Sequence, residues 1–274
     1  LENDPLRIYQ YVRNHFEYVP YYGALKGPYL TLHERAGNDF DQAALLVELL
    51  RAAGYTANFR YGTATVSTTN PVQLKLLADW LGTDEDAQII ADTFSSGGVP
   101  VTLFTTQIQF ERVWVEVTID GAIVSLDPAF KLSEKHSTIN LNTAMGFNQA
   151  SLLAAAGGTV SANSIENINE AGLESHLITL TNQLNTYLKA NHPNDRVEAV
   201  IGGYTIIPDS SDTLPTSLPL SVTPIQAAWT SIPSNYMHTV RLQHSDIDIE
   251  LNTIDIAGRK LSVAYSDQAV PASI

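Results

Sequence analysis

The chain has 274 residues, of which 44 % are hydrophobic and 16 % charged, a balance typical of folded proteins with a substantial core rather than of disordered chains. Its 15 basic and 29 acidic residues give a net charge of −14, which repels nucleic-acid phosphates and anionic lipids and excludes both as expected partners. The chain has no cysteine, which excludes disulfides, thiolate metal ligands and a cysteine nucleophile.

Helical spacing of apolar residues predicts a first helix at 4–18, with Asp4 as its N-cap. Residues 19–37 are expected to form a long loop. The next helix, at 38–53, is apolar nearly all round, so it should be the central buried helix, ended by Gly54.

Alternating apolar and polar residues predict strands at 59–66, 108–119 and 122–126. Asp120 and Gly121 form a hairpin turn between the last two. Residues 71–94 have helical spacing and are expected to form an insert, at about 70–98, between the first strand and this hairpin.

Beyond Lys131 the composition shifts towards Asn, Ala, Ser and Thr. A helix is expected within 163–190 and a linker or extended edge at 207–224, and strands are expected at 240–243, 247–251 and 260–265. The predicted fold is therefore α+β: a core at 1–131, in which the buried helix packs on an antiparallel sheet, and a second region at 132–274, with a helical linker and a small β-rich C-terminal module.

Two segments resemble the transglutaminase-like branch of the papain-like superfamily. The first runs from Gly37-Asn38-Asp39 through the predicted buried helix to Gly54, and the second is Arg112-Val113-Trp114-Val115-Glu116, followed by Leu126-Asp127-Pro128. In that family a Cys begins the buried helix, a His begins the strand and an Asp ends the next strand. The resemblance, which covers about 5–131, places these three positions at Asp39, Arg112 and Asp127.

Two of the three catalytic roles are then absent. A carboxylate such as Asp39 is a poor nucleophile towards an amide, and Arg112 stays protonated, so it cannot accept and return a proton as His does. We therefore expect a catalytically inactive domain in which Arg112 lies between Asp39 and Asp127 in an ion network. Its former cleft is expected to bind a peptide or glycan ligand or another segment of the parent protein, through contacts to Trp114, Glu116, Asp41 and Tyr22.

In the alternative hypothesis the domain is an active enzyme, a hydrolase or an acyl or glycosyl transferase, that uses the carboxylates of Asp39 and Asp127. Asp41 and Glu116 also belong to this carboxylate set. For both residues a structural role is the favoured explanation: helix capping for Asp41, and an outward strand position or a salt bridge for Glu116.

No cofactor or metal is expected, because the histidines lack metal-ligand spacing and the acidic set Asp246, Asp248 and Glu250 lacks the spacing and glycine of an EF-hand loop. The whole chain, including the tail around Ile232-Pro233 and Ala257-Gly258-Arg259-Lys260, resembles N-terminal regions of large bacterial surface or secreted proteins, some with Rhs/YD repeats. This resemblance implies an envelope or secreted location. The start at Leu1, without Met or a signal peptide, indicates a processed product or an excised piece.

Overall fold

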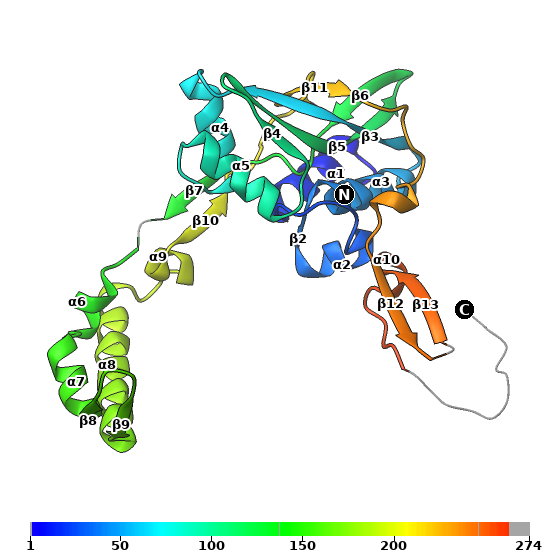
Figure 1. Ribbon diagram of the computed structural model, residues 1–274. Coiled ribbons are helices and arrows are strands. Elements are labelled where there is room, and N and C mark those ends of the chain that lie inside the picture. The colour runs from blue at the N-terminus through cyan, green and yellow to red at the C-terminus, as the bar shows by residue number, and fades with distance from the viewer. Residues whose placement is uncertain (1, 137, 246, 263–274) are drawn as a thin grey trace. The chain divides into compact units, whose positions relative to one another are not determined.

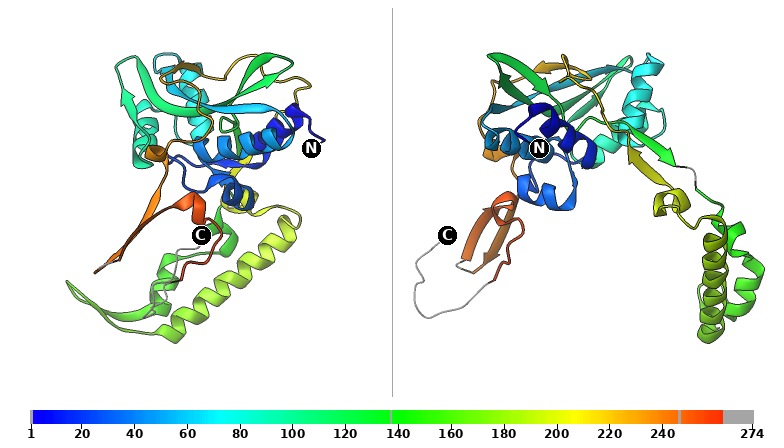
Figure 2. Two further views of the ribbon diagram at one scale, coloured as in Figure 1. Left: turned by 90° about the vertical axis from the view of Figure 1, so that its right-hand side faces the viewer. Right: turned by 180° about the vertical axis from the view of Figure 1, so that it is seen from behind.

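The computed structural model describes residues 2–136, 138–245 and 247–262 and divides into two compact units (Figures 1 and 2). The first unit combines Leu1–Ser133 with Ile206–Ile274, and the second is Glu134–Thr205. The sequence predicts one second region over 132–274; the structure instead returns the chain to the first unit at Ile206. The chain returns to the first unit because residues 221–224 pair with residues 62–65, which form part of the core sheet.

The first unit contains the buried helix, its neighbours and one short 3₁₀ helix. These are α1 (Pro5–His15), α2 (Gly27–Glu34), α3 (Asp39–Ala52), α4 (Pro71–Leu81), α5 (Ala87–Ser96), α10 (Thr253–Ile256) and η1 (Ser234–Tyr236). Asp4 caps α1 and α3 begins directly after its cap Asn38, as predicted. Helix α2 lies inside the segment predicted as a loop; no side chain of its own cap accepts a hydrogen bond there, and Asp41 of α3 accepts one from Gly27 N.

The strands of this unit form one main sheet, one parallel pair and one hairpin. They are β1 (Glu17–Tyr18), β2 (Ala36–Gly37), β3 (Thr56–Ser67), β4 (Val101–Leu103), β5 (Gln107–Ile119), β6 (Ala122–Leu126), β11 (Ser221–Pro224), β12 (Thr239–His244) and β13 (Ile247–Asn252). The main sheet has the order β11-β3-β5-β4, and β6 also pairs with β5. All of its pairings are antiparallel, so the α+β prediction is confirmed.

One edge of β5 is interrupted. Strand β4 pairs with residues 108–110 of β5 and β6 pairs with residues 115–119, which leaves residues 111–114 without a strand partner on that side within the described chain. Residues of the candidate site fill this gap.

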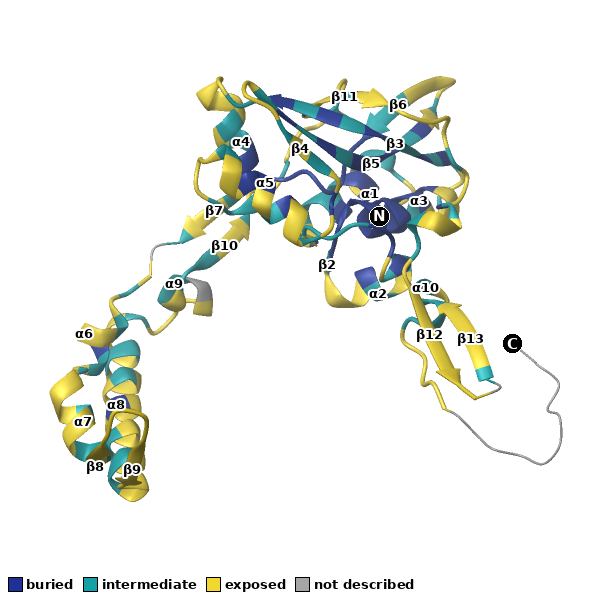
Figure 3. Cartoon of the chain, in the orientation of Figure 1, coloured by how far each residue is buried: buried dark blue, intermediate teal, exposed yellow. Residues whose placement is uncertain are grey.

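The sheet has an apolar layer on each face. Tyr61 and Val113 pair across β3 and β5 and belong to the cluster around α3, whereas Ala64 and Phe110 pair in the same ladder and belong to the cluster under α4 and α5. Because successive side chains of a strand alternate between faces, the two clusters lie on opposite sides of the sheet. Figure 3 shows that α3 is buried over most of its surface, whereas β12 and β13 are exposed.

The second unit is mainly helical, and its chain enters and leaves through a pair of strands. Its elements are β7 (Ser133–His136), α6 (Leu141–Met145), α7 (Gln149–Ala156), β8 (Gly157–Val160), β9 (Ile165–Ile168), α8 (Glu170–Asn191), α9 (Val197–Ile201) and β10 (Gly203–Ile206). The predicted helix within 163–190 begins only at Glu170, because residues 165–168 pair with β8 instead.

Two C-terminal predictions differ in outcome. The strands predicted at 240–243 and 247–251 form the β12–β13 hairpin. Of the strand predicted at 260–265, residues 260–262 are not in a strand, and 263–265 lie outside the described residues, as does Asp246 of the acidic set.

Candidate functional site

The N-terminus of α3 positions Asp39. The Asn38 side chain accepts a hydrogen bond from Asp41 N at 2.9 Å and donates to the carbonyl oxygens of Tyr21 and Gly23, each at 2.7 Å. These bonds fix the start of the helix against the preceding loop, as expected of an N-cap. Asp39 is the first helical residue, so its carboxylate lies at the positive end of the helix dipole.

The carboxylate of Asp39 fills the gap in the edge of β5. Its Oδ2 accepts a hydrogen bond from Val113 N at 2.8 Å, and its Oδ1 accepts one from Phe40 N at 3.1 Å. Asp39 therefore replaces the missing strand partner and ties the start of α3 to the centre of β5.

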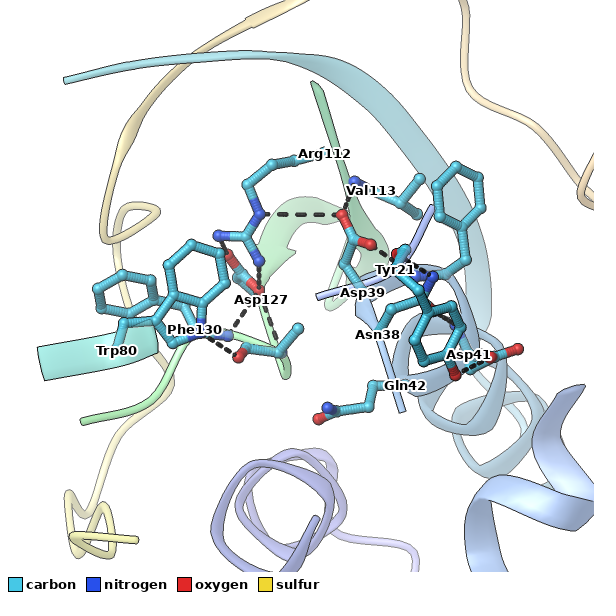
Figure 4. Close-up of polar contacts among 12 residues, drawn as sticks. Tyr21, Asn38, Asp39, Asp41, Gln42, Trp80, Arg112, Val113, Asp127 and Phe130 are labelled. Carbon is cyan, nitrogen blue, oxygen red and sulfur yellow. Dashed lines mark hydrogen bonds and ion pairs between the residues drawn. The ribbon is translucent and has the colours of Figure 1, made fainter. Parts of the chain in front are cut away.

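Arg112 lies between the two carboxylates, as predicted, but its contacts with them are unequal (Figure 4). Its Nη1 lies 2.8 Å from Asp127 Oδ2 and its Nη2 donates to Asp127 Oδ1 at 3.0 Å, whereas its Nε lies 3.9 Å from Asp39 Oδ2. The guanidinium therefore makes a two-point ion pair with Asp127 and a longer contact with Asp39.

Asp127 follows β6 and is itself held by the backbone. Its Oδ1 also accepts hydrogen bonds from the N–H groups of Ala129 at 3.1 Å and Phe130 at 3.0 Å. The position of its carboxylate is therefore set by the turn after β6 as well as by Arg112.

Trp80 of α4 covers the guanidinium. The Arg112 Cζ lies 4.4 Å from the centre of the Trp80 ring, a cation–π geometry, and Trp80 Nε1 donates to the Ala129 carbonyl at 2.9 Å. This role could not be predicted from the sequence, in which Trp80 only contributes to the helical spacing of the expected insert. Figure 4 shows the indole beside the Arg112–Asp127 pair.

The three central side chains are almost completely removed from solvent. Asp39 and Asp127 are each 5 % exposed and Arg112 is 2 % exposed. Burial raises the pKa of Asp39 to about 6, and the opposing effects of Arg112 and the Val113 N–H are smaller. A substrate cannot reach these groups without movement of the surrounding chain.

Asp41, one of the predicted ligand contacts, is fully buried and bonded to the loop before α2. It accepts hydrogen bonds from the Tyr21 hydroxyl at 2.5 Å and from the backbone N–H groups of Lys26 and Gly27. These donors surround the N-terminus of α2, so Asp41 caps that helix from a distance.

The other three predicted contacts lie in different surroundings. Trp114 is only 3 % exposed, and within the described chain its indole nitrogen has no hydrogen-bond partner. Glu116 pairs with Arg60 at 3.1 Å, with its side chain 23 % exposed. Tyr22 is half-buried and donates from its hydroxyl to Glu111 at 2.8 Å.

The buried amine of Lys131 also contacts the first turn of α3, and the sequence did not predict this contact. Lys131 is 2 % exposed, and its Nζ donates to Gln42 Oε1 at 2.6 Å and to the Phe16 carbonyl at 2.5 Å. Burial lowers the pKa of Lys131 well below its usual value. In the sequence Lys131 marked only the end of the core.

A model of the transglutaminase-like superfamily matches residues 2–128. This part of the chain is therefore a transglutaminase-like domain, with the expected α+β fold. Comparison with curated proteins and with solved structures found no match for the chain.

Among residues 2–136, 138–245 and 247–262, no helix has the length and apolar character that crossing a membrane requires. No group of three or more His, Asp or Glu side chains in the same part of the chain is arranged to hold a metal ion.

Proposed function

We propose that residues 2–128 form a catalytically silent transglutaminase-like domain that acts as a binding or scaffolding module. The observation that carries this proposal is the ion pair of Arg112 with Asp127, at 2.8 Å and 3.0 Å, placed beside Asp39 at the start of the buried helix. These three residues occupy the order and elements in which transglutaminase-like enzymes hold Cys, His and Asp.

The chemistry of the three side chains supports the proposal that the domain is catalytically inactive. The amidase step needs a thiolate at the start of the helix and a neighbouring group that exchanges protons near neutral pH. Asp39 offers a weak nucleophile that already accepts two backbone hydrogen bonds. Arg112 stays protonated and is held by Asp127 through one hydrogen bond from Nη2 and an ion-pair contact of Nη1, so it stabilises the fold and does not exchange a proton.

The module is proposed to belong to a bacterial envelope or secreted protein, on the basis of the whole-chain resemblance and the Asn- and Thr-rich sequence after Lys131. Its ligand is proposed to be a peptide, a glycan or another segment of the parent protein. Among the predicted contacts, Tyr22 and Glu116 are partly exposed, so these two side chains are accessible to such a ligand. Fractionation of the host's cells and medium tests the proposed location.

One observation favours the alternative of an active hydrolase or transferase. The pKa of Asp39, raised to about 6, is close to the value that suits a general acid or base near neutral pH. Against this reading, the cation of Arg112 occupies the space between the two carboxylates, where a scissile bond would have to lie.

The experiment compares wild type with Asp39→Ala on peptide amides, amine acceptors and glycans. No turnover by either protein is expected, and turnover by wild type that Asp39→Ala abolishes would overturn the proposed silence. The double variant Asp39→Cys with Arg112→His, next to Asp39→Cys alone, tests the positions themselves. Amidase activity in the double variant alone supports their assignment, and a folded but inert double variant counts against it.

A further inference from the structure

Strand β6 is an edge strand whose outward side has no strand partner in the described chain. The turn before it has positive φ at both Asp120 (50°) and Gly121 (82°), which defines a two-residue type I′ hairpin. Ile119 and Ala122, which flank this turn, therefore form a hydrogen-bonded pair, and hydrogen-bonded pairs recur at every second residue.

This register decides which backbone groups point outward. Val124 pairs with Val117, and its N–H and C=O groups point towards β5. The N–H and C=O groups of its neighbours Ile123 and Ser125 therefore point away from β5. Within the described residues no backbone hydrogen bond satisfies the outward groups of Ile123 and Ser125. The edge of β6 thus presents a short row of unpaired donors and acceptors.

The sequence and pairing of β6 itself carry no protection against a further strand. Edge strands normally carry charges, proline or a bulge that prevents further pairing. Residues 122–126 are Ala, Ile, Val, Ser and Leu, they pair with β5 without a bulge, and Ile123 is 70 % exposed. An exposed isoleucine on an unprotected edge favours cross-strand contact with an added strand.

A groove lies beside this edge. It has a volume of about 770 Å³ and is lined by residues 123–125 and 214–222. Leu214 packs on the cluster around α3 together with Val124, whereas Leu220 belongs to the cluster on the other face of the sheet. Residues 214–222 therefore run alongside β6 as they pass from one face to the other, and they form the second wall.

The second wall cannot itself complete the sheet. Pro215 and Pro219 have no N–H to donate, and residues 214–220 are not in a strand. The volume lies in the range of about 300–1,000 Å³ that ligand sites occupy. A five-residue strand, about 17 Å long, matches the length of β6, whereas a second folded domain is too wide to pair with β6 inside a walled groove.

The groove is also uncharged, although the chain as a whole has a net charge of −14. Its walls offer only Leu, Ile, Val, Pro, Ser and Thr side chains. A charged peptide would lose hydration there without gaining an ion pair. A peptide with apolar and hydroxyl side chains therefore matches these walls.

We propose that β6 is a docking edge for an extended, uncharged peptide segment, which adds to the sheet as a strand between β6 and residues 214–222. Main-chain hydrogen bonds to Ile123 and Ser125 hold it, and the groove walls select its side chains. This inference concerns a surface outside the Asp39–Arg112–Asp127 site and holds whether or not that site is silent.

The test titrates the ¹⁵N-labelled full chain with the peptide acetyl-Thr-Val-Thr-Val-Thr-amide and follows backbone amides by NMR. The expected result is saturable shifts confined to residues near β6 and 214–222, with slower hydrogen exchange at Ile123 and Ser125. The variant Ile123→Lys should weaken binding at least tenfold, because the new charge protects the edge. The matched control is Val72→Lys on α4, where the native side chain is 75 % exposed and lies outside the groove, and it should bind as wild type does.

Urea midpoints of both lysine variants should equal that of wild type, which shows that any loss of binding is local. No shift at millimolar peptide, or equal weakening by both variants, overturns the proposal. A dimer in sedimentation that Ile123→Lys dissociates, with no peptide-induced shift at β6, also overturns it and assigns the edge to a second copy.

Discussion

Arg112 and Asp127 form a buried ion pair in which both terminal nitrogens of the guanidinium face the carboxylate, at 2.8 Å and 3.0 Å, and in which both side chains are less than 7 % exposed. The chain also has an exposed pair of the same kind. Arg241 and Asp248 on the β12–β13 hairpin make two contacts, at 2.7 Å and 2.6 Å, with about half of each side chain exposed. The two pairs differ chiefly in burial.

Removing the buried cation should therefore destabilise the fold strongly. Arg112→Leu leaves Asp127 and Asp39 buried without their counter-charge, and the expected loss in the free energy of unfolding is about 3–5 kcal/mol. Arg241→Leu should change it little, since solvent and salt screen the exposed pair. Urea unfolding of both variants measures the difference, and equal effects would show that burial does not determine the contribution of the pair.

Asp39 should make the stability of the protein depend on pH. Its pKa in the folded state is about 6, above the ordinary 3.8, so the folded protein holds this proton more tightly than the unfolded chain. The free energy of unfolding should then fall as pH rises from about 4 to about 6, and this group alone contributes roughly 3 kcal/mol to the fall.

The variant Asp39→Asn isolates this effect. It keeps an oxygen that accepts the Val113 N–H but cannot ionise, so the fall between pH 4 and 6 should become smaller. Asp92→Asn, on the exposed face of α5, is the control for a general change in charge. Urea midpoints at several pH values decide the matter: an unchanged pH dependence in Asp39→Asn would contradict the raised pKa.

Trp80 should stabilise the domain through its indole nitrogen as well as its ring. Trp80→Phe removes the donor to the Ala129 carbonyl and weakens the contact with Arg112, with an expected loss of about 1–2 kcal/mol. Trp229→Phe is the matched control, because the indole nitrogen of Trp229 donates to the Gln226 side chain at an exposed position. Thermal unfolding of the two variants should rank Trp80→Phe as the less stable, and the reverse order would contradict the proposed role.

The local elements of the core could be predicted from the sequence because their signals are local. Asp4 and Asn38 cap the helices that they were expected to cap, and Asp120-Gly121 forms the expected hairpin turn. Helix α2 could not be predicted in this way. Its N-terminal N–H groups are satisfied by Asp41, a residue 14 positions further along the chain, and a contact at that separation leaves no periodic pattern.

The same distinction holds at the site. Asp39, Arg112 and Asp127 were predicted to meet because each lies at a defined position of a recognisable motif, and the structure brings them together. Nothing in the spacing distinguished Trp80 from an ordinary core residue of the insert. Its role depends on how α4 packs over β5, which is a tertiary contact.

Lys131 should affect stability in the direction opposite to Asp39. Burial holds its pKa well below 10.5 in the folded state, so the unfolded chain binds the proton more tightly, and the free energy of unfolding should rise with pH between the two pKa values. The measurement is made between pH 7 and 9, below the ordinary tyrosine pKa of about 10, so that tyrosine ionisation does not contribute.

The variant Lys131→Met should abolish this rise in the free energy of unfolding. It also leaves the Gln42 and Phe16 oxygens without their donor, which should cost about 1–3 kcal/mol at pH 9. Lys75→Met, at an exposed position on α4, is the control, and a rise with pH that survives in Lys131→Met would show that another group titrates.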